Sequence, residues 1–263
     1  MSSHVDVLGS AATAVVVLAV LTWLVSLAKR DAGIADIVWG LGFVVIGWVS
    51  WSVGDGLADR RSLLVAMVTI WGLRLAIHLI WRSRGQPEDF RYASMRRRAG
   101  DRFAITSLFT VFLLQGALML LVSLPVQLAM TPTEPDVGVL AIIGVVVWGV
   151  GLFFETVADA QLTRFRNDPD NDGAVLDWGL WRYSRHPNYF GDFCVWWGLY
   201  LTAAETTDAR WAIVGPIVMS VLLLRVSGVT MLERSLHTRR EGYADYMART
   251  SVFFPRPPKD LDR

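Results

Sequence analysis

Residues 8–27 read LGSAATAVVVLAVLTWLVSL, a run of twenty residues without a charged side chain. A bilayer core about 30 Å thick is crossed by about 20 mostly apolar residues in an α-helix, so this run predicts a transmembrane helix. No basic residue precedes it, whereas Lys29 and Arg30 follow it at once. That order is the reverse of a cleavable signal peptide. We therefore expect a retained span whose N-terminus lies outside the cytoplasm.

Six further apolar stretches follow, each separated from the next by polar or charged residues. The predicted spans cover residues 8–27, 34–53, 63–81, 104–124, 138–157, 189–204 and 211–231. The sequence contains no internal repeat, and the segments between spans are too short to bury a core of their own. We expect an all-α, polytopic membrane protein with about seven transmembrane helices and a single domain, residues 1–263.

The composition agrees with this class. Hydrophobic residues make up 53% of the chain and charged residues 19%, which is more apolar than a typical soluble domain. The net charge of +1 excludes no class of partner by itself. The single cysteine, Cys194, excludes an intrachain disulfide framework and a cysteine-based zinc site.

Basic residues predict the orientation, because cytoplasmic loops are enriched in Lys and Arg. Residues 82–103 contain seven arginines, and residues 232–263 contain six arginines and one lysine. Residues 125–137 contain neither Lys nor Arg. Seven spans place both basic segments on one side, so we expect the N-terminus outside and the C-terminus in the cytoplasm. Arg60 and Arg61 oppose this orientation.

Asp36 opens the second predicted span. An ionisable residue within a span is costly and is therefore a candidate functional residue. The alternative is a helix-end residue paired with Lys29 or Arg30, and the sequence leaves both interpretations open.

Two further polar pairs fall within spans. Arg74 and His78 are four residues apart, so they share one face of the third predicted helix. Glu155 and Asp159 share a face near the end of the fifth. Arg74 and His78 could also form a purely structural interhelical pair.

The densest polar group is residues 179–192, GLWRYSRHPNYFGD, where a cytoplasmic loop enters the sixth predicted span. Arg185 offers a planar fork suited to phosphate, and His186 and Asn188 can donate further hydrogen bonds. Pro187 suits the first turn of a helix, whose free N–H groups attract anions. The segment predicts a site for a phosphate-bearing cofactor from the cytoplasm. The alternative is a juxtamembrane anchor that contacts lipid headgroups.

Residues 185–192, RHPNYFGD, resemble the C-terminal signature of the membrane-embedded steroid 5-alpha-reductase and sterol reductase superfamily. Residues 71–74 (WGLR) and 88–92 (EDFRY) look like its bacterial branch, formerly labelled a domain of unknown function. Matching positions also occur between residues 243 and 255. The resemblance covers nearly the whole chain and is most specific over residues 151–255.

This resemblance implies an integral protein of the bacterial inner (plasma) membrane that uses NADPH. Residues 131–263 would form the cofactor-binding half with its cytoplasmic tail, and residues 1–130 the substrate-side helices. The G-x-G-x-x-G fingerprint of a Rossmann domain is missing from the sequence. The cofactor contacts that the resemblance implies are Asp159, Arg166, Tyr183, Asn188, Tyr189 and Asp192. Arg185 and His186, the donors of the motif above, complete the candidate cofactor-binding residues.

The sequence departs from the family on the substrate side. Steroid reductases hold and protonate the substrate 3-ketone with a Glu on the second span and a Tyr on the third. Here Asp36 is the acid nearest that place, and Trp71 stands where the tyrosine would be. A buried Asp36 would remain protonated and could donate to a carbonyl, while Tyr92 or His78 could supply the missing donor. The candidate catalytic residues are therefore Asp36, His78 and Tyr92.

The expected activity is NADPH-dependent reduction of a carbon–carbon double bond in a lipophilic, for example 3-oxo-steroid-like, enone. One alternative is an S-adenosylmethionine-dependent methyltransferase of the isoprenylcysteine or phospholipid type, whose members look similar around Arg185–Gly191 and share the pair Tyr243 and Tyr246. Another is a non-catalytic lipid-binding membrane protein. The expected partners are a lipophilic substrate and membrane lipid, and the sequence leaves the oligomeric state open.

Two other motifs carry less weight. Residues 168–173, DPDNDG, look like the opening of a calcium-binding loop, but the twelfth position is Gly179 rather than Glu. We therefore expect no metal. The arginines at 96–98 adjoin a span, so they indicate topology and contact with anionic lipid rather than nucleic acid.

Overall fold

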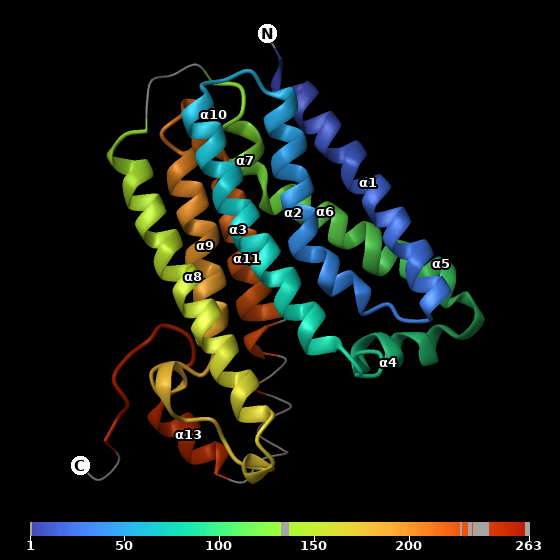
Figure 1. Ribbon diagram of the computed structural model, residues 1–263, viewed down its shortest axis with the longest axis vertical. Coiled ribbons are helices and arrows are strands. Elements are labelled where there is room, and N and C mark those ends of the chain that lie inside the picture. Colours follow the sequence, from blue (N-terminus) through green and yellow to red (C-terminus); the bar gives the residue numbers. More distant parts are fainter. Residues whose placement is uncertain (1, 133–136, 227, 231–232, 234–241, 261–263) are drawn as a thin grey trace. The chain divides into compact units, whose positions relative to one another are not determined.

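Every regular element of the computed structural model (Figure 1) is helical within the described residues, 2–132, 137–226, 228–230, 233 and 242–260. The all-α prediction is therefore confirmed for this part of the chain. The end of the seventh predicted span and several basic residues of the predicted tail lie outside the described residues, namely Arg234, Arg239, Arg240 and Arg263.

The chain divides into two compact units, which we describe separately. Unit 1 comprises Met1–Ile142 and Leu199–Gly215, and unit 2 comprises Ile143–Gly198 and Pro216–Arg263. The predicted division at residue 130 concerns function and stays a prediction.

Unit 1 contains the first seven helices and one short later helix. They are α1 (His4–Lys29), α2 (Ile34–Val53), α3 (Ala58–Ser83), α4 (Phe90–Ala99), α5 (Phe103–Ser107), α6 (Leu114–Val122), α7 (Leu124–Leu128) and α10 (Thr207–Arg210). A π-helical segment, Leu108–Leu113, joins α5 to α6. In Figure 1, α4 lies at the end of unit 1 where α1 and α3 end and α2 begins, and it runs across these helices rather than along them.

Unit 2 is built around two longer helices and a C-terminal segment. It contains most of α8 (Val139–Arg166) and of α9 (Pro187–Ala203), the end of α11 (Val214–Val221), and α13 (Tyr243–Arg249). Pro187 occupies the first position of α9, as the sequence predicts, because proline lacks the N–H that a first helical turn leaves unpaired.

Six helical stretches among the described residues are long and apolar enough to cross a membrane. They are His4–Lys29, Ile34–Val53, Ala58–Ser83, Phe90–Val122, Val139–Arg166 and Thr207–Val226. The sixth predicted span corresponds to α9, whose 17 residues make it shorter than these six. An integral membrane protein is supported, while the seventh crossing and the orientation of the termini stay predictions.

Helices α2 and α3 pack backbone against backbone at a pair of glycines. A Cβ atom added to Gly40 would lie 2.6 Å from the carbonyl oxygen of Gly72, and one added to Gly72 would lie 2.6 Å from that of Gly40. Small residues of this kind allow close helix approach in membranes, where lipid offers no hydrophobic drive for association. The N-terminal end of α2, which carries Asp36, is thereby held against α3.

Arg60 and Arg61, which oppose the predicted orientation, are both engaged within unit 1. Arg60 is only 3% exposed and lies 3.8 Å from Glu205. Arg61 donates hydrogen bonds to the carbonyl oxygens of Gly56 and Trp51 at 3.0 and 2.6 Å. Both arginines are therefore part of the protein's own packing at this end of the helices.

Candidate functional site

The carboxylate of Asp36 connects a tyrosine and an arginine in unit 1. Tyr92 donates its hydroxyl proton to Oδ1 of Asp36 at 2.6 Å, and Arg91 donates to Oδ2 at 2.5 Å. The side-chain amide of Gln115 donates to the Tyr92 hydroxyl at 3.3 Å. Asp36 thus accepts one hydrogen bond from a neutral phenol and one from the fixed positive charge of Arg91.

Local capping positions these side chains at the start of α4. Asp89 is the N-cap residue and accepts hydrogen bonds from both the backbone N–H and Nε of Arg91, each at 2.9 Å. A capping carboxylate of this type satisfies donors that a helix start leaves free. Burial alone would raise the pKa of Asp89, but its hydrogen bonds with Arg91 outweigh burial and hold the pKa below its usual value.

The neighbouring Glu88 ties α4 to the turn between α1 and α2. It accepts from the backbone N–H of Ala32 at 2.8 Å and from Arg96 at 2.7 and 3.1 Å. Burial opposes its ionisation, yet the hydrogen bonds from Arg96 and Ala32 lower its pKa. The segment 88–92 thus brings Tyr92 to Asp36 across a sequence separation of 56 residues.

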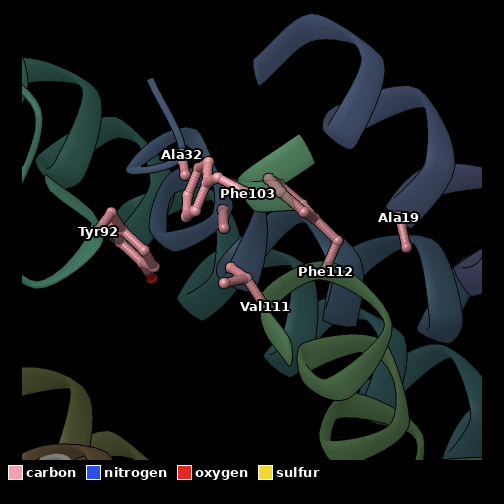
Figure 2. Close-up of a cluster of buried hydrophobic side chains, with 7 residues drawn as sticks. Ala19, Ala32, Tyr92, Phe103, Val111 and Phe112 are labelled. Carbon is pink, nitrogen blue, oxygen red and sulfur yellow. The ribbon is translucent and has the colours of Figure 1, made fainter. Parts of the chain in front are cut away.

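The ring of Tyr92 belongs to a cluster of buried apolar side chains. In Figure 2 it lies at one end of this cluster, which also contains Ala32, Phe103, Val111 and Phe112. Only 6% of Tyr92 is exposed. A phenol hydroxyl at the edge of apolar packing could serve as a donor to a lipophilic carbonyl once its single O–H turns away from the carboxylate that now accepts it.

His78, the third candidate catalytic residue, lies half-buried on α3. Trp71, which stands at the family's tyrosine position, is fully buried, and its ring packs edge-on against Phe43 at 5.6 Å between centroids. The donor role of His78 stays a prediction.

The predicted cofactor contacts all lie in unit 2. Asp159 and Arg166 are on α8, and Tyr183, Arg185 and His186 precede α9, while Asn188, Tyr189 and Asp192 lie on its first two turns. The side-chain amide of Asn188 donates to Oδ1 of Asp159 at 3.1 Å. Asp159 is 7% exposed, whereas Arg166 is exposed and Tyr183 is 43% exposed.

Arg185 forms an ion pair with Glu233. Its Nε and one terminal nitrogen donate to the two oxygens of Glu233, each at 2.9 Å. Its other terminal nitrogen donates to the carbonyl oxygens of Met247 and Thr250 at 2.8 and 3.1 Å. The fork that the sequence predicts for phosphate thus secures the C-terminal segment against the start of α9.

His186 and Tyr243 complete this cluster. The Nε2 atom of His186 lies 3.0 Å from Glu233, and the hydroxyl of Tyr243 donates to Glu233 at 3.2 Å. Burial opposes the charge of Glu233, but the hydrogen bond with His186 and the charge of Arg185 outweigh it and lower the pKa of Glu233. Burial, followed by the nearby charge of Glu233, raises the pKa of Tyr243.

The loop before α9 rests on α8 through backbone and side-chain hydrogen bonds. The indole N–H of Trp181 donates to the carbonyl oxygen of Ala158 at 3.1 Å, and Gln161 accepts from the backbone N–H of Leu180 at 3.0 Å. Tyr246 donates to the carbonyl oxygen of Trp181 at 2.6 Å. These contacts leave Tyr183 exposed while holding its neighbours.

Sequence reasoning selected Asp36 and Tyr92 separately, and the structure brings them together. It missed the roles of Arg91, Gln115 and Glu233. Arg91 lies in the family-like segment 88–92, which could have marked it as a candidate. Neither its contact with Asp36 nor the pairing of Glu233 with Arg185 follows from sequence spacing, because the partners are 55 and 48 residues apart.

Comparison with known proteins gives one match. No curated protein and no solved structure matches the chain. A family model described as a protein of unknown function (DUF1295) matches residues 22–250. Because this match spans most of the sequence, the chain belongs to that family.

Proposed function

We propose that this protein is a membrane-embedded, NADPH-dependent reductase of the carbon–carbon double bond in a lipophilic enone. The observation that carries the proposal is the hydrogen bond of 2.6 Å between Tyr92 and Asp36. The resemblance to steroid 5-alpha-reductases calls for an acid on the second span and a tyrosine. The tyrosine comes from α4 instead of the third span.

The Tyr92–Asp36 pair suits activation of a carbonyl group. Because the single O–H of Tyr92 is donated to Asp36 in this structure, it would have to turn from the carboxylate to the substrate carbonyl oxygen, where negative charge develops as the double bond is reduced. Asp36, kept as a carboxylate by Arg91, orients the phenol and cannot itself be the donor while that ion pair is intact. This network favours Tyr92 over Asp36 as the proton donor. NADPH would supply the hydride for the β-carbon, and the α-carbon then takes up a proton.

The described residues of unit 2 fit part of what NADPH requires. Arg166 is an exposed residue whose guanidinium is a group suited to a phosphate, and Tyr183 is an exposed residue whose ring suits stacking. Asn188, Asp159 and Asp192 can bind amide and hydroxyl groups of the nicotinamide riboside. Arg185 and His186 would act indirectly, through the segment that they hold, because both contact Glu233.

The methyltransferase alternative rests partly on the tail tyrosines. Tyr243 and Tyr246 have structural roles here, since they donate to Glu233 and to the carbonyl oxygen of Trp181. These contacts need no methyl donor. Binding of S-adenosylmethionine in place of NADPH would favour the methyltransferase.

The activity can be tested with detergent-purified protein, NADPH and a panel of lipophilic enones, with NADPH consumption as the signal. Tyr92→Phe removes the donor but keeps the ring, so turnover should fall by about 10²–10⁴-fold. The matched control is Tyr200→Phe, which removes a hydroxyl that donates to the carbonyl oxygen of Arg210 and should leave turnover unchanged. Normal turnover in Tyr92→Phe would remove Tyr92 from the mechanism, and no consumption with any enone would count against the reductase.

A further inference from the structure

The two ends of unit 1 differ sharply in exposed charge. Around α4, where α1 and α3 end (Figure 1), the exposed cations are Lys29, Arg30, Arg82, Arg84, Arg97, Arg98 and Arg102. Asp101 is the one exposed acid among the described residues there. At the opposite end the described residues include the exposed acids Asp6, Asp55, Asp59 and Asp208. The α4 end therefore carries a large surplus of accessible positive charge.

The arginines near α4 fall into two classes. Arg91 and Arg96 are held by carboxylates, with ion pairs to Asp36, Asp89 and Glu88. These ion pairs occupy Asp36, Asp89 and Glu88, which leaves Asp101 and the half-buried Asp31 beside the seven exposed cations. The exposed cations around them consequently have little internal charge to neutralise them, and they are available to an external anion.

The shape of α4 suits the surface of a bilayer. One face carries Tyr92, Met95 and Ala99, which belong to or pack against the apolar cluster of Figure 2. Another part carries Phe90, which is 68% exposed, and Arg98. The exposed arginines beside an exposed aromatic ring, and not the packed face, are the features of α4 that suit the membrane interface.

An exposed tryptophan adds an independent mark of the interface. Trp81, at the end of α3, is 54% exposed and immediately precedes Arg82. Tryptophan is enriched where a membrane-spanning helix leaves the hydrocarbon core. The position of Trp81 next to Arg82 is therefore what we expect of residues at the depth of lipid phosphates.

We propose that this α4 surface, formed by the seven exposed cations together with Trp81 and Phe90, binds the phosphates of anionic phospholipid headgroups. Arginine forks pair closely with phosphate oxygens, and basic residues next to a span gain free energy from an anionic leaflet. The exposed aromatic rings favour a lipid over a soluble polyanion. This proposal is independent of the reductase assignment.

The test is native mass spectrometry of the full-length protein in detergent, titrated with phosphatidylglycerol or phosphatidylcholine. Phosphatidylglycerol should bind more tightly. The triple variant Arg97→Gln, Arg98→Gln and Arg102→Gln should weaken its binding by about 100-fold, since each arginine contributes about fivefold. Arg98→Gln alone should weaken binding about fivefold, whereas the control Arg210→Gln, an exposed arginine at the opposite end, should change nothing.

The remaining arms separate lipid from other anions and from misfolding. The triple Arg→Lys variant keeps the charge and should bind phosphatidylglycerol within about threefold of the parent. If the triple Gln variant does not fold, Arg98→Gln against Arg210→Gln decides the question. Equal binding of both lipids, undiminished binding in Arg98→Gln, or displacement of the lipid by equimolar inorganic phosphate or a short RNA would overturn the proposal.

Discussion

Single carboxylates organise both candidate clusters. Asp36 receives Tyr92 and Arg91, whereas Glu233 receives Arg185, His186 and Tyr243. Ionising a half-buried acid that has several donors costs little free energy. Removing it destabilises the fold, because its partners are then left without a counter-charge. These two residues are therefore the most informative positions for substitution.

Glu233→Gln should lower the stability of unit 2 by about 3 kcal/mol at neutral pH, because it leaves the half-buried Arg185 without its anion. The pKa of Glu233 is lowered in the fold, so its contribution is present above the usual glutamate pKa and is lost as the pH falls through the lowered value. Melting temperatures measured from pH 7 down to about pH 3 should show the parent and the variant converging. Asp177→Asn, which removes an exposed acid 3.5 Å from Arg249, is the control and should cost about 0–1 kcal/mol. A gap that stays constant with pH would contradict this role of Glu233.

At the scale of elements, hydropathy predicted where the long apolar helices lie but not where they end. The second predicted span, residues 34–53, coincides with α2. The fifth, 138–157, is extended by α8 to Arg166, because helical hydrogen bonding continues past the apolar run through polar residues. Helix α4 was missed within the predicted loop 82–103, since a short amphipathic helix lacks the long apolar run that marks a span.

The close approach of Gly40 and Gly72 between α2 and α3 can be tested by substitution. Gly40→Ala places a methyl group against the backbone of Gly72, and helices in close contact must then separate, at a cost of about 1–3 kcal/mol. Gly9→Ala on α1 is the matched control, because nothing lies within 4 Å of its added Cβ, and it should be neutral or stabilising by up to ~1 kcal/mol. Thermal unfolding in detergent measures both. Equal melting temperatures for Gly40→Ala and the parent would show that the contact tolerates separation.

For the whole molecule, the sequence predicted the all-α class and the long apolar helices, but not how distant polar residues pair. Arg60 and Arg61 illustrate the reason. Their positions in the sequence oppose the predicted orientation. In the structure, Arg60 lies next to Glu205 and Arg61 donates hydrogen bonds to two backbone carbonyl groups. Pairings of this kind depend on helix packing between distant segments, which periodicity does not encode.

Orientation can be tested at the two ends of one helix. Asp59 and Arg84 are both exposed and lie at the start and just after the end of α3, while the native Cys194 is buried. In intact cells a membrane-impermeant maleimide should label Asp59→Cys at once and Arg84→Cys only after permeabilisation, because we expect the α4 end to face the cytoplasm. Labelling in the reverse order would invert the topology, and immediate labelling of both would mean that α3 does not cross the membrane.

The most direct test of the reductase is the melting temperature of the purified full-length protein with NADPH and, separately, with S-adenosylmethionine. A ligand at 100 times its dissociation constant stabilises a fold by about 2.7 kcal/mol, so a saturating cofactor should raise the melting temperature measurably. We predict a rise with NADPH, no change with S-adenosylmethionine, and a smaller NADPH effect in Asn188→Ala. A rise with S-adenosylmethionine and none with NADPH would contradict the central claim.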